Sequence, residues 1–154
     1  MLFVLFLGGC GNQLVNQAIQ DAKVALENQN YERALSLLLM ASHEGAEAEI
    51  ENLHYQLGYL IAMNKYLAAR QLDAALLQWT ELNLSPSDSR IVKDEAVRLL
   101  QLELQDAAAV LQQGAGPRDL EYASDLIQRL STFEMFQGDV GQLKSLKDRG
   151  NLSP

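Results

Sequence analysis

The residue of this chain with the clearest potential for chemistry is its only cysteine, Cys10. It follows the apolar run 1–7 and two glycines, Gly8 and Gly9. A short apolar segment that ends in small residues is typical of the core and cleavage site of an export signal. The sequence therefore predicts a signal segment over residues 1–9, with Cys10 directly after it.

The four residues Leu7, Gly8, Gly9 and Cys10 resemble the lipobox of bacterial lipoproteins. The resemblance implies that the Cys10 thiol receives a diacylglyceryl group and that the chain is cut before it. The two glycines suit this chemistry because they are too small to obstruct lipid transfer or cleavage. Residues 10–13 would then form a lipidated tether. The implied location is the extracytoplasmic face of the cell membrane, or the outer membrane if the host has one.

Residues 1–9 contain no Lys or Arg, although an export signal usually begins with a basic region. We expect the true start to lie upstream of Met1. The alternative is an ordinary apolar N-terminal segment whose free thiol packs as a small apolar group. In either case the segment is too short to span a bilayer as a helix, which needs about 20 residues.

Composition limits the remaining possibilities. The chain has 154 residues, 48% of them hydrophobic, with only 10 Gly and 3 Pro, which predicts one globular domain over 14–150. A net charge of −8 excludes nucleic acid as a partner, because such binding needs clustered Lys and Arg. One cysteine also excludes an internal disulfide, so stability must come from packing.

The rest of the chain predicts an all-α fold, because Ala, Leu, Gln and Glu dominate and no strand-like alternation persists. Ser85 and Pro86 have the form of a helix N-cap followed by proline at the first helical position. We therefore expect a helix from this point to residue 113. The other expected helices cover 12–27, 31–42, 46–69, 72–83, 118–136 and 139–149.

A pattern recurs at the start of three of these helices, at residues 31, 72 and 120. Each copy places a large residue, a small alanine and another large residue on one helical stripe. The alanine would let a neighbouring helix approach closely. The copies are Tyr31, Ala34, Leu38 and Ala41; Leu72, Ala75, Trp79 and Leu82; and Leu120, Ala123, Ile127 and Leu130.

This pattern resembles the second helix of tetratricopeptide (TPR) repeats, and the layout resembles small TPR-like lipoproteins of bacteria. The resemblance implies helical hairpins stacked as a right-handed solenoid of about three hairpins. Two features depart from it: Gln29 and Arg70 replace the glycine usual before the turn, and the copies are further apart than about 34 residues. The alternative is an ordinary helical bundle.

Stacked hairpins form a concave surface that suits an extended or helical peptide. The predicted surface consists of four residues in 46–69 and three basic residues after position 85. They are Gln56, Tyr59, Met63 and Tyr66, followed by Arg90, Lys93 and Arg98.

No pattern in the sequence indicates catalysis, a metal site or a cofactor. His43 and His54 lie outside any His-Glu-x-x-His arrangement, and a packed or solvated imidazole explains each of them better. The glutamates at 44, 47, 49 and 51 lack calcium-loop spacing and are expected to form a solvated helix start. The chain is therefore predicted not to be an enzyme and to need no cofactor.

The predicted function is a lipid-anchored helical-repeat scaffold that mediates protein–protein interaction at the bacterial membrane, with an unknown protein or peptide partner. Two alternatives remain: a binder of small molecules or cell-wall fragments, and a structural assembly factor. An open groove would favour the scaffold, and a closed pocket with convergent polar groups would favour the small-molecule binder.

Overall fold

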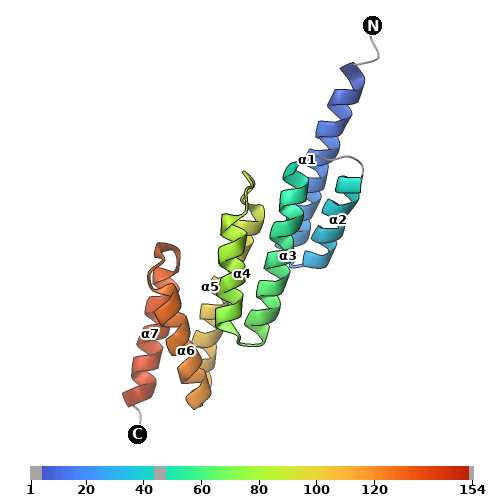
Figure 1. Cartoon of the computed structure of the whole chain (residues 1–154). Helices are drawn as coiled ribbons and strands as arrows, with labels where there is room; N and C mark the ends of the chain where they lie inside the picture. The colour runs from blue at the N-terminus through green and yellow to red at the C-terminus, as the bar shows by residue number, and fades with distance from the viewer. Residues whose placement is uncertain (1–4, 44–47, 153–154) are drawn as a thin grey trace. The chain divides into compact units, whose positions relative to one another are not determined.

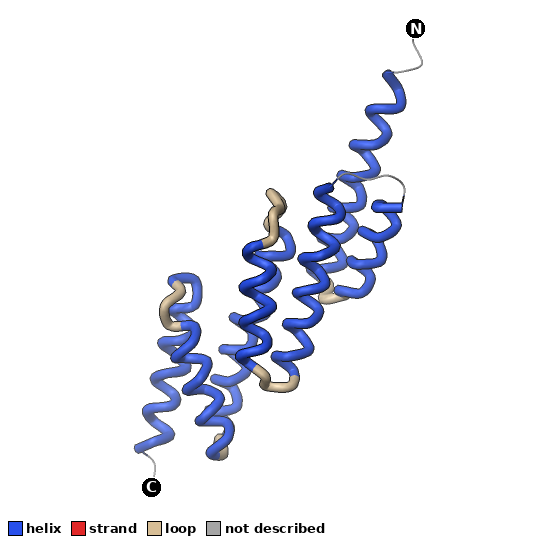
Figure 2. Tube along the Cα trace, viewed as in Figure 1, coloured by secondary structure: helices blue, strands red, loops and turns tan. Residues whose placement is uncertain are grey.

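The computed structural model of the chain describes residues 5–43 and 48–152, and every regular element within them is helical (Figures 1 and 2). This confirms the expected all-α class. In chain order the elements are α1 (Leu5–Glu27), α2 (Tyr31–His43), α3 (Ala48–Ala68), α4 (Leu72–Leu84), α5 (Ile91–Gly114), α6 (Pro117–Leu130), the 3-10 helix η1 (Glu134–Phe136) and α7 (Gln137–Leu152).

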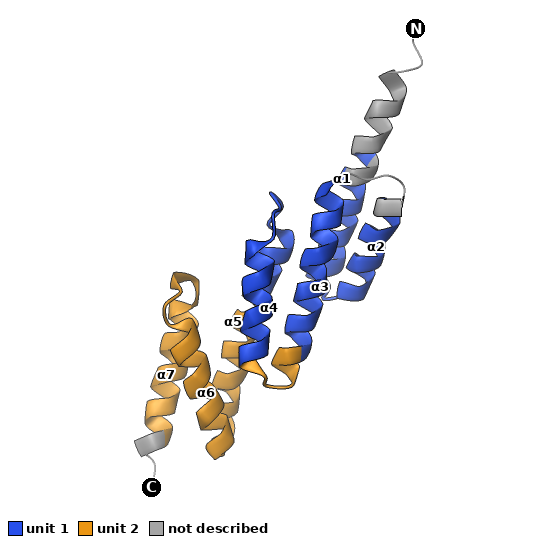
Figure 3. Cartoon of the chain, in the orientation of Figure 1, with its two compact units in different colours: residues 1–65, 73–96 blue, residues 66–72, 97–154 orange. Residues whose placement is uncertain are grey.

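The chain forms two compact units (Figure 3). Unit 1 comprises Met1–Lys65 and Asp73–Ala96. Unit 2 comprises Tyr66–Leu72 and Val97–Pro154. The expected domain is thus built from two bodies, and α3 and α5 each contribute residues to both.

Helix α1 begins at Leu5, earlier than the expected start at residue 12. The backbone of the lipobox residues 7–10 and of the expected tether 10–13 is therefore helical. No proline interrupts this stretch, so the helix continues through its glycines. The side chains of Leu7 and Cys10 lie outside the described residues.

Two turns of the chain have the same geometry. After α1, the Gln29 N–H donates to the Leu26 carbonyl (2.9 Å) and the Asn30 N–H to the Ala25 carbonyl (2.8 Å). After α3, the amides at positions 70 and 71 repeat this pattern at 3.0 and 2.9 Å. This is the Schellman arrangement, which puts its turn residue in the left-handed region usually taken by glycine. Gln29 and Arg70 occupy it with φ of 59° and 54°.

The alanines of the three sequence copies are fully buried, as the pattern predicted: Ala34, Ala75 and Ala123 each have 0% exposure. Trp79 is also buried, in agreement with a core position. The stripe therefore faces inward on α2, α4 and α6. A small residue at the point of closest approach lets each helix pack tightly on its neighbours.

The expected start of the fifth helix at Ser85 is wrong, because residues 85–90 form a loop and α5 begins at Ile91. The Ser87 hydroxyl donates to Glu49 Oε1 at 2.6 Å instead of capping a helix. The Ser89 N–H donates to the same carboxylate oxygen at 3.2 Å. From the other side, Lys93 Nζ donates to the carbonyls of Ser85 (3.2 Å) and Asn83 (3.4 Å). These contacts hold the loop in place of a first helical turn.

The expected helix over 118–136 is also wrong, because α6 ends at Leu130 and η1 and α7 follow. A continuous helix would turn Phe136 away from the buried stripe that ends at Leu130. The break lets Phe136 become fully buried. Gln137 supports the break by donating its side-chain amide to the Ser131 carbonyl at 3.0 Å. Helices α6 and α7 pack against each other in unit 2.

Candidate binding surface

Two residues of the predicted concave surface cannot contact a partner in this conformation. Gln56 and Met63 both have 0% exposure. Both side chains lie on the inner side of α3, where the spacing of Leu53, Leu57 and Leu60 continues the buried stripe. The prediction is corrected for this pair, since a fully buried side chain offers no contact area.

The other five residues of that surface have mixed environments. Tyr59, Tyr66 and Arg98 are half-buried. Arg90 is exposed and its Nε lies 3.7 Å from Asp94 Oδ1 on the next turn of α5. Lys93 is engaged with the two carbonyls of the α4–α5 loop. Its ammonium stabilises the protein's own loop, which argues against a role in binding.

Gln56 has a further property that the sequence did not reveal. Neither its Oε1 nor its Nε2 atom has a hydrogen-bond partner among the described residues. A buried amide without partners costs about 1–3 kcal/mol of folding free energy. Gln56 is therefore a source of instability in the core of unit 1.

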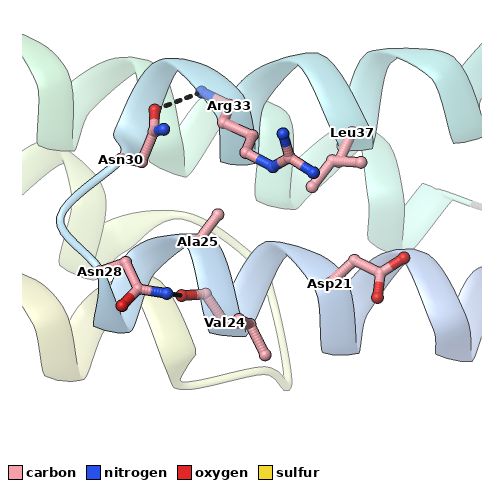
Figure 4. Close-up of a pocket in the computed structure, with 7 residues that line it drawn as sticks. All are labelled: Asp21, Val24, Ala25, Asn28, Asn30, Arg33 and Leu37. Carbon is pink, nitrogen blue, oxygen red and sulfur yellow. Dashed lines mark hydrogen bonds between the residues drawn. The ribbon is translucent and has the colours of Figure 1, made fainter.

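One hollow of unit 1 lies between α1 and α2 (Figure 4). We call it the α1–α2 groove; its volume is about 310 Å³. Most of its lining residues are exposed and only Ala25 is buried, so the groove is open to solvent. It is lined by Asp21, Val24, Ala25, Asn28, Asn30, Arg33 and Leu37.

The turn between the two helices shapes one end of the groove. The Asn30 Oδ1 atom accepts the Arg33 N–H at 3.1 Å and so caps the start of α2. The Asn28 Nδ2 atom donates to the Val24 carbonyl at 2.9 Å at the end of α1. Both asparagine side chains thereby satisfy backbone hydrogen-bonding groups, at the end of α1 and the start of α2. The apolar residues of the lining are Val24, Ala25 and Leu37.

Opposite charges lie on the two sides of the groove. Asp21 is on α1 and accepts a hydrogen bond from the Gln17 side-chain amide at 2.8 Å. Arg33 is on α2, and Figure 4 shows its side chain extending along the helix toward Leu37. Within the described part of the chain, no ion pair is formed by either residue. Both charges are therefore available to another molecule.

The sequence reading missed this groove, although a signal for it was present. Asp21, Val24 and Asn28 recur at three- and four-residue spacing on one face of α1. Arg33, Leu37 and Met40 do the same on α2. These outer stripes lie beside the buried faces of the two helices, and each contains a charged residue and at least one apolar residue. Single exposed apolar residues are common on protein surfaces, so neither stripe indicates a groove by itself. The two stripes form a groove only when the helices pack side by side.

A second hollow, of about 490 Å³, lies on the other side of the α1–α2 turn. We call it the polar hollow, because carboxamide and charged side chains dominate it. Its wall includes Tyr31, whose hydroxyl donates to Glu95 Oε1 at 2.7 Å in the buried interior. Most of its other residues are exposed, so this hollow is also open. It is lined by Asn28, Gln29, Asn30, Tyr31, Glu32, Ile61, Asn64 and Lys65.

Unit 2 contains a polar network around the α3–α4 turn. Arg70 Nη1 donates to Asp119 Oδ1 at 2.8 Å, and its guanidinium lies 5.2 Å from the centre of the Tyr122 ring. The Tyr122 hydroxyl donates to Glu103 Oε1 at 2.6 Å. Asp119 Oδ2 also accepts the Gly116 N–H at 2.9 Å and so caps α6. The network joins the turn to α5 and α6.

Burial and pairing move the pKa values of this network in opposite directions. Burial raises the pKa of the Glu103 carboxyl, against the opposing effect of the hydrogen bond from Tyr122. Burial and the bond to Glu103 raise the pKa of the Tyr122 phenol. The Arg70 guanidinium and the Gly116 N–H lower the pKa of Asp119. The four side chains are thus held by contacts with one another and with the start of α6.

Among the described residues, no group of three or more His, Cys, Asp or Glu could hold a metal ion. His54 is half-buried, with its ring 5.7 Å from the Tyr55 ring in an edge contact. The side chains of His43 and Cys10, and residues Glu44 and Glu47, lie outside the described part. Over that same part, no helix has the length and apolar character that crossing a membrane requires.

Comparison with known proteins finds no matching family model, no matching curated protein and no matching solved structure.

Proposed function

We propose that this chain is a lipid-anchored scaffold that binds a protein through the α1–α2 groove at the extracytoplasmic face of a bacterial membrane. The observation that carries the proposal is the open groove, whose lining combines the apolar Val24 and Leu37 with the charged Asp21 and Arg33. Apolar side chains surrounded by polar ones are typical of protein-binding surfaces.

The same proposal includes the arrangement of the helices as repeated hairpins. The identical turns at Gln29 and Arg70 and the buried alanines of α2, α4 and α6 support repeated helical hairpins of the TPR-like kind. We propose that about three such hairpins stack as a right-handed solenoid.

The anchor rests on Leu7, Gly8, Gly9 and Cys10. Cys10 and Asp21 belong to the same helix, α1, and are roughly 16 Å apart along it at 1.5 Å per residue. A partner bound there would be held close to the membrane.

The test uses the tagged full-length protein as bait in detergent-solubilised cell envelope. Val24→Lys puts a charge inside the groove, and Leu77→Lys on α4 is the matched control. The two side chains are equally exposed, at 55% and 58%. We expect the wild type and the control to capture the same protein, and Val24→Lys to capture at least about tenfold less. Equal capture by all three would contradict the groove, and no capture even after crosslinking in cells would contradict the scaffold.

The polar hollow favours one alternative, a binder of small polar molecules such as cell-wall fragments. The carboxamides of Gln29 and Asn64 line this hollow and could bond a polar ligand together with Lys65. A fragment that raises the melting temperature of the wild type, but not of Asn64→Ala, would support this alternative. Because ligand pockets are usually enclosed and this hollow is open to solvent, small-molecule binding is the less favoured of the two functions.

A further inference from the structure

The α1–α2 groove is complementary to itself, and we propose that its occupant is a second copy of this chain related by two-fold symmetry. This inference rests on the proposed role of the groove in binding protein, and it names the protein. It does not depend on the lipid anchor.

The outer stripes of the α1–α2 hairpin expose apolar side chains. Val24 on α1 is 55% exposed, and Met40 on α2 is 64% exposed. Leu37 lies one turn before Met40 on the same face and is half-buried. Two such hairpins facing each other would form a four-helix arrangement that covers the apolar side chains of both copies. The same surface serves both chains, as a two-fold interface requires.

The charges determine how the copies meet. When the two-fold axis runs parallel to the helices, α1 of one copy faces α2 of the other. Asp21 of each copy then meets Arg33 of the other, which gives two equal ion pairs. A foreign partner would have to supply both a base and an acid at matching positions, whereas a second copy supplies them by symmetry.

The two residues lie at different levels along the helices, and the Arg33 side chain spans the difference. At 1.5 Å per residue, Asp21 lies about 12 Å and Arg33 about 6 Å from the turn centred on Gln29. The Arg33 side chain extends from its backbone away from the turn, toward the level of Leu37 (Figure 4). Its length bridges the remaining offset. Neither residue has an ion pair to break within the described chain.

This orientation places the beginnings of both α1 helices on the same side of the dimer. Two chains that are anchored through Cys10 in one membrane need this arrangement. An antiparallel pairing would direct the two anchors to opposite sides.

The test is co-purification of two differently tagged full-length copies, expressed together and extracted from whole cells in mild detergent. Asp21→Arg and Arg33→Asp are made separately, because each puts like charges face to face twice in a two-fold dimer. We expect wild-type copies to co-purify, and copies that carry the same single reversal to co-purify at least about tenfold less.

The decisive sample combines one copy carrying Asp21→Arg with one carrying Arg33→Asp. The introduced charges are complementary across the interface, so we expect co-purification to return to the wild-type level. Val24→Lys in both copies should abolish it, and Leu77→Lys should leave it intact. The rescue shows that the single variants fold, because the same chains associate when they are mixed.

Three outcomes would overturn the dimer: wild-type copies that do not co-purify, single reversals without effect, or a mixed pair that is not rescued. The proposed function fails differently. If the bait captures only a foreign protein through Val24 while its own copies do not associate, the groove binds protein and the second copy is wrong. If the copies associate and Val24→Lys does not weaken their association, the contact lies outside the α1–α2 groove. Both proposals are then wrong about the binding surface.

Discussion

At the scale of single residues, this protein contains polar groups in its interior that differ in how well they are satisfied. Tyr31 and Tyr122 each donate a short hydrogen bond to a glutamate of α5, Glu95 and Glu103. Gln56 has no such partner. A satisfied buried polar group contributes modestly to stability, whereas an unsatisfied one carries its full desolvation cost.

Replacing Gln56 by leucine should therefore stabilise unit 1. Gln56→Leu is expected to raise the free energy of unfolding by about 1–3 kcal/mol, because it removes an unsatisfied amide of similar size from the core. Urea denaturation followed by circular dichroism measures the change. Gln20→Leu, at an exposed position of α1, is the control and should change stability by less than about 0.5 kcal/mol. A loss of stability in Gln56→Leu would show that the amide binds a partner of its own.

Glu103 should make stability fall as the pH rises. Its carboxyl has an ordinary pKa near 4.5 and a raised pKa in the folded chain, so folding favours the protonated form. Stability is full below about pH 4.5 and declines as the pH rises through the folded pKa. Glu103→Gln keeps an acceptor for the Tyr122 hydroxyl and removes the titration.

The measurement for Glu103 is urea denaturation of wild type and Glu103→Gln at several pH values from 4.5 upward. The stability difference should shift in favour of the variant as the pH rises. Asp119→Asn is the counterpart with opposite sign, because the pKa of Asp119 is lowered by Arg70. Its loss of stability should be present at neutral pH and disappear in acid. A pH-independent difference for Glu103→Gln would contradict the role of burial.

At the scale of elements, the turns at Gln29 and Arg70 form a matched pair. Both residues adopt a left-handed backbone conformation, which costs a residue with a side chain about 1 kcal/mol relative to glycine. Gln29 is exposed, and its side chain forms no hydrogen bond with the described residues. Arg70 compensates through its ion pair with Asp119 and its position over the Tyr122 ring.

Glycine should therefore act differently at the two turns. Gln29→Gly is expected to stabilise the chain by about 1 kcal/mol, since it relieves the backbone without losing a contact. Arg70→Gly should gain little or nothing, because the lost ion pair and ring contact are together worth about as much. Thermal and urea unfolding of both variants test the contrast. Equal gains at the two turns would show that the Arg70 contacts contribute nothing.

At the scale of the whole molecule, the proposed anchor and the helical units should be independent. Cys10→Ala is expected to remove the protein from the membrane fraction, or to leave uncleaved precursor, while helicity and melting stay unchanged. The attachment depends on acyl chains, each buried CH₂ contributing about 0.8 kcal/mol. The net charge of −8 gives the chain no electrostatic attraction to an anionic membrane.

Cell fractionation and intact-mass analysis measure this prediction. The extracted wild type should have a diacylglyceryl addition on a chain that begins at Cys10. Wild-type protein that fractionates with the cytosol, with a free thiol and Met1 still attached, would contradict the anchor. The α1–α2 groove and its tests would be unaffected.

The sequence by itself determined the helical class, the turns at 28–30 and 70–71, and the inward face of α2, α4 and α6. These features depend on local periodicity and on breaks between helices, which neighbouring residues encode. Ala34, Ala75 and Ala123 could be recognised as core positions because a small residue recurs at one place on each stripe.

Only the tertiary structure decided which polar residues are inside and where two helices begin or end. Residues 85–90 stay a loop because Glu49, far away in the sequence, accepts hydrogen bonds from Ser87 and Ser89. Gln56 has the spacing of a core residue and the chemistry of a surface residue, and packing placed it in the core. The α1–α2 groove likewise exists only when two helices are paired, because neither stripe forms it alone. Contacts between distant segments outweigh local preference at these positions, and no local pattern encodes them.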